Sequence, residues 1–233
     1  MIDIDLILPI YNESQNVLNL IPKLKKNINY NFRILFCYDD EKDDIFKIIN
    51  QIDKFSINYK LIRNFSKGPC NAVKSGFKFS DSKCCIVYPA DDFYNYKIIN
   101  KMYKLFIKGN DIVVPSRFIE GGEMKDCPLI KSILVRVGNF TLFKLSNIGV
   151  RDSSNGFRLF SNKIIKKYSV VSNVGFTYSI ELLIKAKIDG YKIAETPSKW
   201  IERKKGESNF KVFKWINSYF YWYLYAITHN LKK

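Results

Sequence analysis

The sequence contains almost no histidine, and its cysteines form no metal-binding pattern. His229 is the only histidine in 233 residues, and the five cysteines include no CxxC pair. Tetrahedral zinc sites need clustered cysteine and histidine ligands, and a Ser–His–Asp triad would have to use His229 in the C-terminal tail. The composition therefore argues against a zinc site and a hydrolase triad. An odd cysteine count without CxxC spacing favours reduced, mostly buried thiols in a cytoplasmic protein.

Several other sequence signals are also missing. The first predicted strand is not followed by GxGxxG, and no GxxxxGK[ST] occurs, which argues against a dinucleotide-binding Rossmann site and a P-loop. No stretch approaches the ~20 apolar residues of a membrane span. The start, Met1-Ile2-Asp3-Ile4-Asp5, is acidic where a signal peptide would be basic.

The chain does have a large excess of basic residues. Lysine and arginine number 38 against 22 acidic residues, which gives a net charge of +16. Nucleic acid, an anionic membrane face and phosphorylated substrates would all fit this charge. A genome that uses lysine as its default surface residue explains it equally well. Charge alone does not choose among these partners.

The first half alternates short apolar runs with amphipathic segments, the pattern of βαβ units and a parallel sheet. We expect strands at 4–8, 32–38, 59–63, 84–88 and 111–115, and helices at 13–28, 43–55, 70–79 and 96–108. Asn12 is expected to cap the first helix. In the second half, 117–127 is predicted as a loop, 130–146 and 178–189 as helices, and 157–160 and 192–200 as strands. An aromatic helix follows at 210–230. The hydrophobic content of 47% suits one α/β domain.

Polar residues follow four of the predicted strands. The segment Pro9-Ile10-Tyr11-Asn12-Glu13 follows the first strand, Asp39-Asp40 the second, Asp91-Asp92 the fourth, and Ser116-Arg117 the fifth. Ligands of open α/β sheets bind outside the carboxyl ends of the strands. Crowded carboxylates repel each other unless a cation or a hydroxyl-rich ligand lies among them. The sequence therefore predicts a site for a nucleotide sugar with a divalent metal.

The ordered motifs resemble family-two glycosyltransferases, in particular the dolichol-phosphate mannosyltransferase-like branch. The resemblance begins with Leu8-Pro9-Ile10-Tyr11-Asn12-Glu13 and covers nearly the whole chain in the right order. The further motifs are Asp39-Asp40, Gly68-Pro69-Cys70-Asn71-Ala72 with Gly76, Ala90-Asp91, Val114-Pro115-Ser116-Arg117-Phe118 with Gly121-Gly122, Asp152-Ser153-Ser154-Asn155-Gly156-Phe157-Arg158-Leu159, Glu181, Glu195-Thr196-Pro197, Arg203 and Gly206-Glu207-Ser208.

This resemblance implies a GT-A fold and the inverting transfer of a sugar from a nucleotide diphosphate. It implies that the loop of Pro9, Tyr11 and Glu13, together with Asp39 and Asp40, holds the base and ribose. Asp91, next to Ala90, would bind Mg²⁺ or Mn²⁺, with Asp92 as a possible second ligand because Pro89 replaces the first acid of the DxD element. Arg117 and Arg203 would face the phosphates and stabilise the leaving group, and residues 152–158 would line the acceptor side.

Each of these residues also has a simpler structural interpretation. Asp92 suits a helix cap, Asp39 and Asp40 suit turns, Glu13 suits a helix N-terminus, and the arginines suit ion pairs. Asp152 could tie down its loop, and Glu181 on an apolar helix must be functional or paired. A lipid-phosphate acceptor is already anionic and needs no strong base, whereas a sugar hydroxyl would require Asp152 or Glu181 to take the proton.

Tryptophan and tyrosine crowd the predicted C-terminal helix, and lysines flank it. Such composition suits a helix lying in the membrane interface, although packing against the core or against a dimer partner would also explain it. We divide the domain into a donor half (1–117), an acceptor half (118–209) and this helix (210–233). We expect a metal-dependent glycosyltransferase that acts at the cytoplasmic membrane face on a polyprenyl-phosphate or glycan acceptor.

Two other classes remain open. A sugar-phosphate nucleotidyltransferase would share the nucleotide-binding layout, but it needs a Gly-rich basic loop where Tyr11-Asn12-Glu13 stands. A non-catalytic basic module that binds membrane or nucleic acid would explain the charge. The predicted acidic rim argues against nucleic acid as a partner, because carboxylates repel a polyanion.

Overall fold

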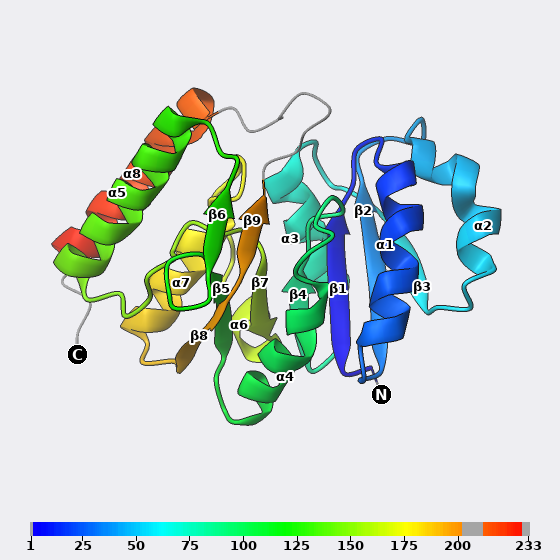
Figure 1. The fold of residues 1–233 in the computed structure, drawn as a ribbon, viewed down its shortest axis with the longest axis horizontal. Coiled ribbons are helices and arrows are strands. Elements are labelled where there is room, and N and C mark those ends of the chain that lie inside the picture. Colours follow the sequence, from blue (N-terminus) through cyan, green and yellow to red (C-terminus); the bar gives the residue numbers. More distant parts are fainter. Residues whose placement is uncertain (1, 202–211, 230–233) are drawn as a thin grey trace.

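A seven-stranded sheet forms the centre of the protein in the computed structural model, which describes residues 2–201 and 212–229 (Figure 1). The strand order is β3-β2-β1-β4-β7-β5-β8, and β7 alone in this sheet runs antiparallel to its neighbours. The strands are β1 (Ile4–Pro9), β2 (Phe32–Tyr38), β3 (Tyr59–Arg63), β4 (Cys84–Val87), β5 (Ile112–Ser116), β7 (Arg158–Ser161) and β8 (Ile193–Pro197). A second, two-stranded sheet pairs β6 (Glu123–Lys125) with β9 (Lys199–Ile201).

Helices cover both faces of the large sheet (Figure 1). The first face carries α1 (Ser14–Asn27), α2 (Ile49–Asp53) and α4 (Ile99–Ile107), with short 3₁₀ turns at Asp44–Ile48 and Tyr96–Ile98. The second carries α3 (Pro69–Phe79), α5 (Leu129–Ser146), α6 (Asn162–Lys167), α7 (Tyr178–Ile188) and α8 (Val212–Thr228). Helices α5 and α8 lie side by side at one end of the molecule, and in Figure 1 α5 covers most of α8.

The central strands are apolar on both faces because helices cover both. On β1, Leu6 and Leu8 pack under the helices of the first face, while Ile7 points into the core of the second. A strand buried on both sides reads as a continuous apolar run rather than an alternating one. The cysteines follow the same pattern, since Cys37, Cys70, Cys84 and Cys85 are buried and none is in a disulfide.

The predicted elements of the first half are confirmed within a residue or two at their ends. Three predictions need correction. The segments 43–55 and 96–108 each begin as a 3₁₀ turn before continuing as an α-helix. The predicted strand 192–200 is two strands, β8 and β9, which belong to different sheets. The predicted loop 117–127 contains β6, whose pairing with β9 joins residues far apart in the sequence. The short helix α6 was not predicted.

The expected cap at Asn12 is also wrong. Asn12 has a positive φ of 54°, and Glu13 occupies the N-cap position of α1 without a side-chain cap. The start of α1 is instead bound by Asp44, whose carboxylate accepts from the Ser14 N–H at 3.0 Å and from the Ser14 hydroxyl at 2.7 Å. The cap therefore comes from a neighbouring segment, which local sequence could not indicate.

The reversed direction of β7 positions the residues that precede it. Val87, at the end of β4, pairs with Arg158, at the start of β7. The segment before β7 therefore lies at the same edge of the sheet as the segments after β1, β4 and β5. This arrangement brings residues 152–157 to the carboxyl edge of the parallel strands.

Gly76 in α3 is fixed by a close approach to the sheet. A Cβ at this position would lie 2.6 Å from Cγ2 of Ile7 on β1. We expect Gly76→Ala to lower the free energy of unfolding by about 1–3 kcal/mol, because overpacking a filled core forces side chains or backbone to shift. Urea unfolding followed by circular dichroism measures this change.

Gly138 in α5 provides the matched control, since a Cβ there meets no atom within 4 Å. Gly138→Ala should leave stability unchanged or raise it by up to about 1 kcal/mol, the difference in helix propensity. Equal destabilisation by the two substitutions would contradict the packing argument.

Candidate active site

A cavity of about 1180 Å³ opens at the carboxyl edge of the sheet. One end lies among the segments that follow β1, β2, β4 and β5, and it contains carboxylates, a tyrosine and an arginine. The other end lies between α5 and α8 and is apolar, with Leu134, Val137, Trp215, Ile216 and Phe220 among its lining residues. The cavity is therefore polar at the sheet and apolar toward the two helices.

Most of the predicted donor-side residues line this cavity: Pro9, Tyr11, Glu13, Asp39, Ala90, Asp91, Asp92 and Arg117. Asp40, Asp152 and Glu181 are not among the described residues that line it. Arg203, predicted to act on the phosphates, lies outside the described residues, as do Gly206, Glu207 and Ser208.

Asp39 and Asp40 have different surroundings although they are adjacent. Asp39 accepts hydrogen bonds from the Asn64 amide at 2.8 Å and from the backbone N–H of Gly68 at 3.1 Å, which hold its carboxylate at the cavity wall. Asp40 accepts from the Lys42 N–H in a turn, and this bond lowers the pKa of its carboxyl. Of the pair, Asp39 lines the cavity and Asp40 does not.

Asp91 and Asp92 also separate in the structure. One Asp92 carboxylate oxygen accepts from the N–H groups of Tyr94 and Asn95 at 2.9 Å, and the other accepts from the Asn95 side-chain amide at 2.6 Å. Burial raises the pKa of the Asp92 carboxyl. These contacts favour the capping role that the sequence left open for Asp92, and they leave Asp91 as the better candidate to reach a metal.

Asn95 extends this anchor to the second sheet. Its amide donates to the Lys199 carbonyl at 2.7 Å and accepts from the Lys199 N–H at 2.9 Å. Asp92 therefore fixes Asn95, and Asn95 fixes the start of β9. The loop that carries Asp91 is tied to the strand that carries Trp200.

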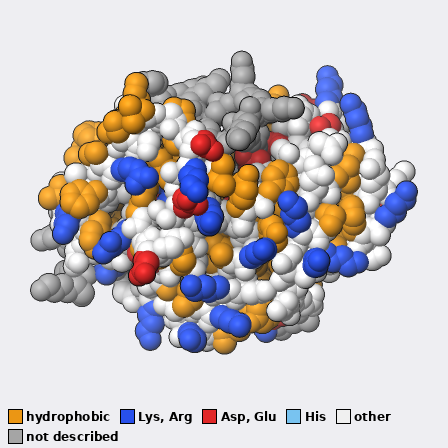
Figure 2. Space-filling model, in the orientation of Figure 1, with side chains coloured by type: hydrophobic (Ala, Val, Ile, Leu, Met, Phe, Trp, Pro, Cys, Tyr) orange, Lys and Arg blue, Asp and Glu red, His pale blue; other side chains and the backbone are white. Residues whose placement is uncertain are grey.

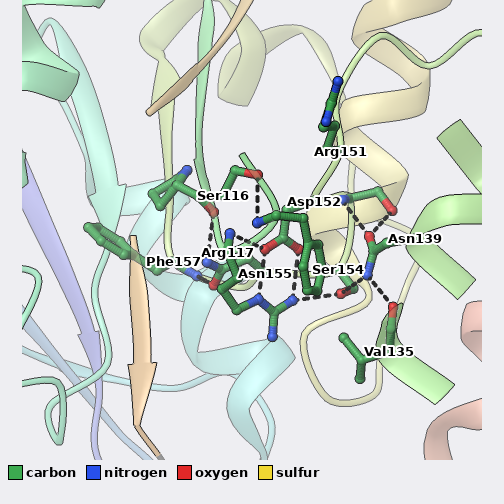
Figure 3. Close-up of polar contacts among 12 residues, drawn as sticks. Ser116, Arg117, Val135, Asn139, Arg151, Asp152, Ser154, Asn155 and Phe157 are labelled. Atoms are coloured by element: carbon green, nitrogen blue, oxygen red, sulfur yellow. Dashed lines mark hydrogen bonds and ion pairs between the residues drawn. The ribbon is translucent and has the colours of Figure 1, made fainter. Parts of the chain in front are cut away.

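Arg117 and Asp152 form a buried ion pair at the centre of the site (Figure 3). The guanidinium donates to both carboxylate oxygens at 2.7 Å, and the Arg117 backbone N–H donates to one of them at 3.0 Å. A planar, bidentate pair of this kind fixes the orientation of both side chains. The ion-pair alternative for Arg117 is thus present, but buried beside the cavity rather than on the surface.

Two cavity residues were missed by sequence reasoning. Lys131 of α5 lies over the ring of Trp200 of β9, with its Nζ 4.4 Å from the ring centroid, and the Arg117 guanidinium lies 5.0 Å from the same ring. The indole thus holds two cations at one side of the cavity. A lysine in a helix without any acidic residue was the available signal, but nothing in the sequence placed it beside Arg117.

Glu181 is fully buried and paired, as its position on an apolar helix required. Its carboxylate accepts from the N–H groups of Val171 and Ser172 at 2.8 Å and from Lys185 at 2.5 Å. The Ser172 hydroxyl in turn accepts from the indole of Trp222 in α8 at 2.9 Å. Glu181 thus holds the segment on which α8 docks.

We expect Glu181→Gln to act on stability rather than on chemistry. The variant loses the charge in three hydrogen bonds and should lower the free energy of unfolding by about 1–3 kcal/mol. Urea unfolding measures this loss, and the exposed Glu120→Gln is the control. A catalytic base would give the opposite pattern, with unchanged stability and a loss of turnover by orders of magnitude.

Residues 5–169 match glycosyl transferase family 2, so the chain belongs to this family. Among curated relatives, it is 27% identical over 215 residues to the dolichol-phosphate mannosyltransferase of Pyrococcus furiosus, covering 89% of this chain and 59% of that protein. It is 25% identical over 138 residues to the polyprenol monophosphomannose synthase of Mycolicibacterium smegmatis, covering 54% of this chain and 52% of that protein. The chain thus spans little more than half the length of these two relatives.

Solved structures with the same arrangement include glucosyl-3-phosphoglycerate synthase from Mycobacterium tuberculosis. Its complex with Mn²⁺, UDP-glucose and phosphoglyceric acid superposes with a TM-score of 0.72 at 12% identity, covering 97% of this chain and 80% of that chain. Its complex with UDP gives a TM-score of 0.69 with the same coverage. These similarities establish the GT-A fold and confirm the fold expected from the motifs.

Proposed function

We propose that the protein is a metal-dependent, inverting glycosyltransferase that moves a sugar from a nucleotide-diphosphate donor to a polyprenyl-phosphate acceptor at a membrane face. The single observation that carries this proposal is the cavity itself, which is acidic and polar at the sheet and apolar between α5 and α8. A nucleotide sugar suits the first end and an isoprenoid chain suits the second.

The donor half of this proposal rests on residues 1–117. Asp39 and Tyr11 line the cavity where the base and ribose would lie, with the start of α3 beside them at Gly68 and Pro69. The N-terminus of a helix favours negative charge. Asp91 lies on the same wall, at the end of β4, where a diphosphate would meet it.

The residues present fit a divalent metal that the donor helps to bind. Within residues 2–201 and 212–229, no group of three or more histidine, cysteine or acidic side chains could hold an ion alone. Mg²⁺ in nucleotide sites is commonly held by one or two carboxylates, with the other ligands from substrate phosphates and water. Asp91 would supply the protein ligand, and the ion would neutralise charge on the leaving diphosphate.

The contacts of the two predicted bases, Asp152 and Glu181, argue for a phosphate acceptor rather than a sugar hydroxyl. Asp152 is occupied by Arg117, Glu181 is occupied by Lys185 and two backbone N–H groups, and neither lines the cavity. A phosphate oxygen is already anionic, so it requires no base but does require cations nearby. Arg117, which the resemblance assigned to the donor phosphates, lines the cavity together with Lys131. We assign both cations to the acceptor phosphate instead.

The outer face of α5 and α8 supports a membrane contact. Outside the cavity lining, it exposes Leu129, Ile130, Phe140 and Leu145 of α5 and Tyr221 and Leu224 of α8. Figure 2 shows hydrophobic side chains gathered over α5 at this end of the molecule. Neither helix contains an acidic residue, and α5 carries Lys131, Arg136 and Lys144. Apolar and cationic side chains together suit an anionic lipid surface. No helix in the described ranges has the length and hydropathy of a membrane span.

Donor hydrolysis tests the transferase proposal. Purified protein is offered GDP-, UDP- and dTDP-sugars with Mg²⁺ or Mn²⁺, with and without polyprenyl phosphate, and nucleoside diphosphate release is followed. We expect release from one donor, abolished by EDTA and lowered about 100-fold or more in Asp91→Asn, because the substitution removes the charge that binds the metal.

Asp92→Asn is the matched variant and should retain more activity than Asp91→Asn, since its oxygen still caps Tyr94 and Asn95. Silence with every donor in the presence of acceptor would contradict the proposal. Consumption of a nucleoside triphosphate would instead favour a nucleotidyltransferase.

Vesicle sedimentation tests the membrane face. The double variant Ile130→Ser with Phe140→Ser removes two side chains of α5 that are 70% and 63% exposed and that do not line the cavity. We expect binding to phosphatidylglycerol vesicles to weaken about tenfold or more, because the variant loses the free energy gained when these two apolar side chains leave water.

The control double variant, Ile107→Ser with Phe79→Ser, removes an isoleucine and a phenylalanine that are 61% and 47% exposed on other helices. It should bind vesicles as the parent does. Equal loss in both variants, or no vesicle binding together with a concentration-dependent dimer, would assign this face to a second copy of the chain.

A further inference from the structure

Asn139 is a buried amide in the middle of α5. It is 4% exposed and lies on α5, whose other buried residues are Leu142 and Ser146. Asparagine is unfavourable inside a helix, since its side chain competes for backbone hydrogen bonds. Its presence on the buried face of α5 calls for contacts that offset the cost of burying an amide.

Those contacts run to the segment that precedes β7 (Figure 3). The Asn139 carbonyl oxygen accepts from the Ser153 N–H at 2.7 Å and from the Ser153 hydroxyl at 2.8 Å. Its amide nitrogen donates to the Ser154 hydroxyl at 2.9 Å and to the Val135 carbonyl of its own helix at 2.8 Å. The two acceptor and two donor positions of the amide are all used.

Ser154 connects this amide to the buried ion pair. Its hydroxyl oxygen accepts from Asn139 and also from the Arg117 guanidinium at 2.9 Å. Arg117 in turn holds both oxygens of Asp152. A continuous hydrogen-bonded path therefore leads from α5 through Ser154 to the Arg117–Asp152 pair beside the cavity.

Two further supports of this segment come from the sheet. Arg158 of β7 is fully buried and donates to the carbonyls of Asp152 and Ser153 at 3.1 and 3.3 Å. Glu195 of β8 accepts from the N–H groups of Arg151 and Asp152 at 2.9 and 3.3 Å. Within the described residues, Asn139 is the side chain of α5 that hydrogen-bonds to residues 152–155.

We propose that Asn139 is a positioning residue through which α5 sets the geometry of the acceptor side. It holds Ser153 and Ser154 and, through Ser154, the Arg117 guanidinium. With its hydrogen-bonding capacity filled, it has none left for a substrate, so its effect reaches the substrate through Ser153, Ser154 and Arg117, which line the cavity. This inference rests on the proposed function, because it assigns Arg117 to the acceptor phosphate.

The same helix lines the apolar end of the cavity and exposes its outer face. The isoprenoid chain of an acceptor bound between α5 and α8 would therefore contact the helix that positions Arg117. The proposal links the apolar part of the acceptor to the charged part of the site through one side chain.

Asn139→Ala tests the proposal, with Ser146→Ala as the control. Ser146 is buried on the same face of α5, but its hydroxyl donates to the Leu142 carbonyl within the helix. Amide hydrogen exchange, followed by mass spectrometry of peptides covering 152–157, is the first measurement. We expect exchange at Ser153 to rise about tenfold or more in Asn139→Ala and to stay unchanged in Ser146→Ala.

Steady-state kinetics are the second measurement, with the active donor and polyprenyl phosphate in detergent micelles. We expect Asn139→Ala to raise the KM for polyprenyl phosphate, or lower the transfer rate, about 10- to 100-fold, since small misplacements of a positioned group have effects of this size. The KM for the nucleotide sugar should change less than about twofold, because Tyr11, Asp39 and Asp91 follow β1, β2 and β4 and Asn139 does not hydrogen-bond to these segments.

Ser154→Ala keeps the proposal testable where Asn139→Ala disturbs folding. It removes the link between Asn139 and Arg117 but leaves both bonds to Ser153, so it should weaken acceptor use without faster exchange at Ser153. Unchanged acceptor kinetics in both variants would overturn the proposal, as would an equal rise in donor KM. If the parent protein releases no nucleoside diphosphate and transfers no sugar, the proposed function fails. In that case, an unchanged exchange rate at Ser153 in Asn139→Ala would by itself show that Asn139 does not hold Ser153 in place.

Discussion

The site depends on one reversed strand. β7 lies between β4 and β5 and runs against both, so the chain enters β7 at the edge where its neighbours end. Residues 152–157 therefore approach the same edge as Asp91 and Arg117. With β7 parallel, Arg158 would lie at the opposite edge, and the Arg117–Asp152 pair would not form.

This arrangement buries charged side chains beside the cavity, and the structure compensates them in different ways. Asp152 is neutralised by Arg117. Among the residues that the structure describes, no carboxylate accepts from Arg158; three backbone carbonyls hold its guanidinium, and burial lowers its pKa to about 10. Removing one partner of such a group leaves a charge in a low-dielectric interior. Rigid placement of residues 152–155 is the structural consequence of these contacts.

Helix α5 has different surroundings on each of its sides. One side meets α8, another lines the apolar end of the cavity, a third anchors residues 153–154 through Asn139, and the outer side remains exposed. This explains why its apolar residues show no single stripe. A helix that packs on one face only would be amphipathic, and the sequence of α5 is apolar around most of its circumference.

The sequence by itself determined the alternation of strands and helices, because apolar runs and turn residues are local signals. It also determined the ordered motifs that mark glycosyl transferase family 2, and the acidic edge that carries Asp39 and Asp91. The capping alternative for Asp92 was visible from the sequence as well, since Asn95 follows three residues later.

The tertiary structure decided which of these residues share a site. It placed Asp44 at the start of α1, paired Glu181 with a backbone segment under α8, and brought Lys131 to Trp200 across 69 positions of sequence. It also joined Asn139 to Arg117 through Ser154. These contacts depend on strand direction and on which helices lie side by side, and neither property is encoded in the periodicity of a single segment.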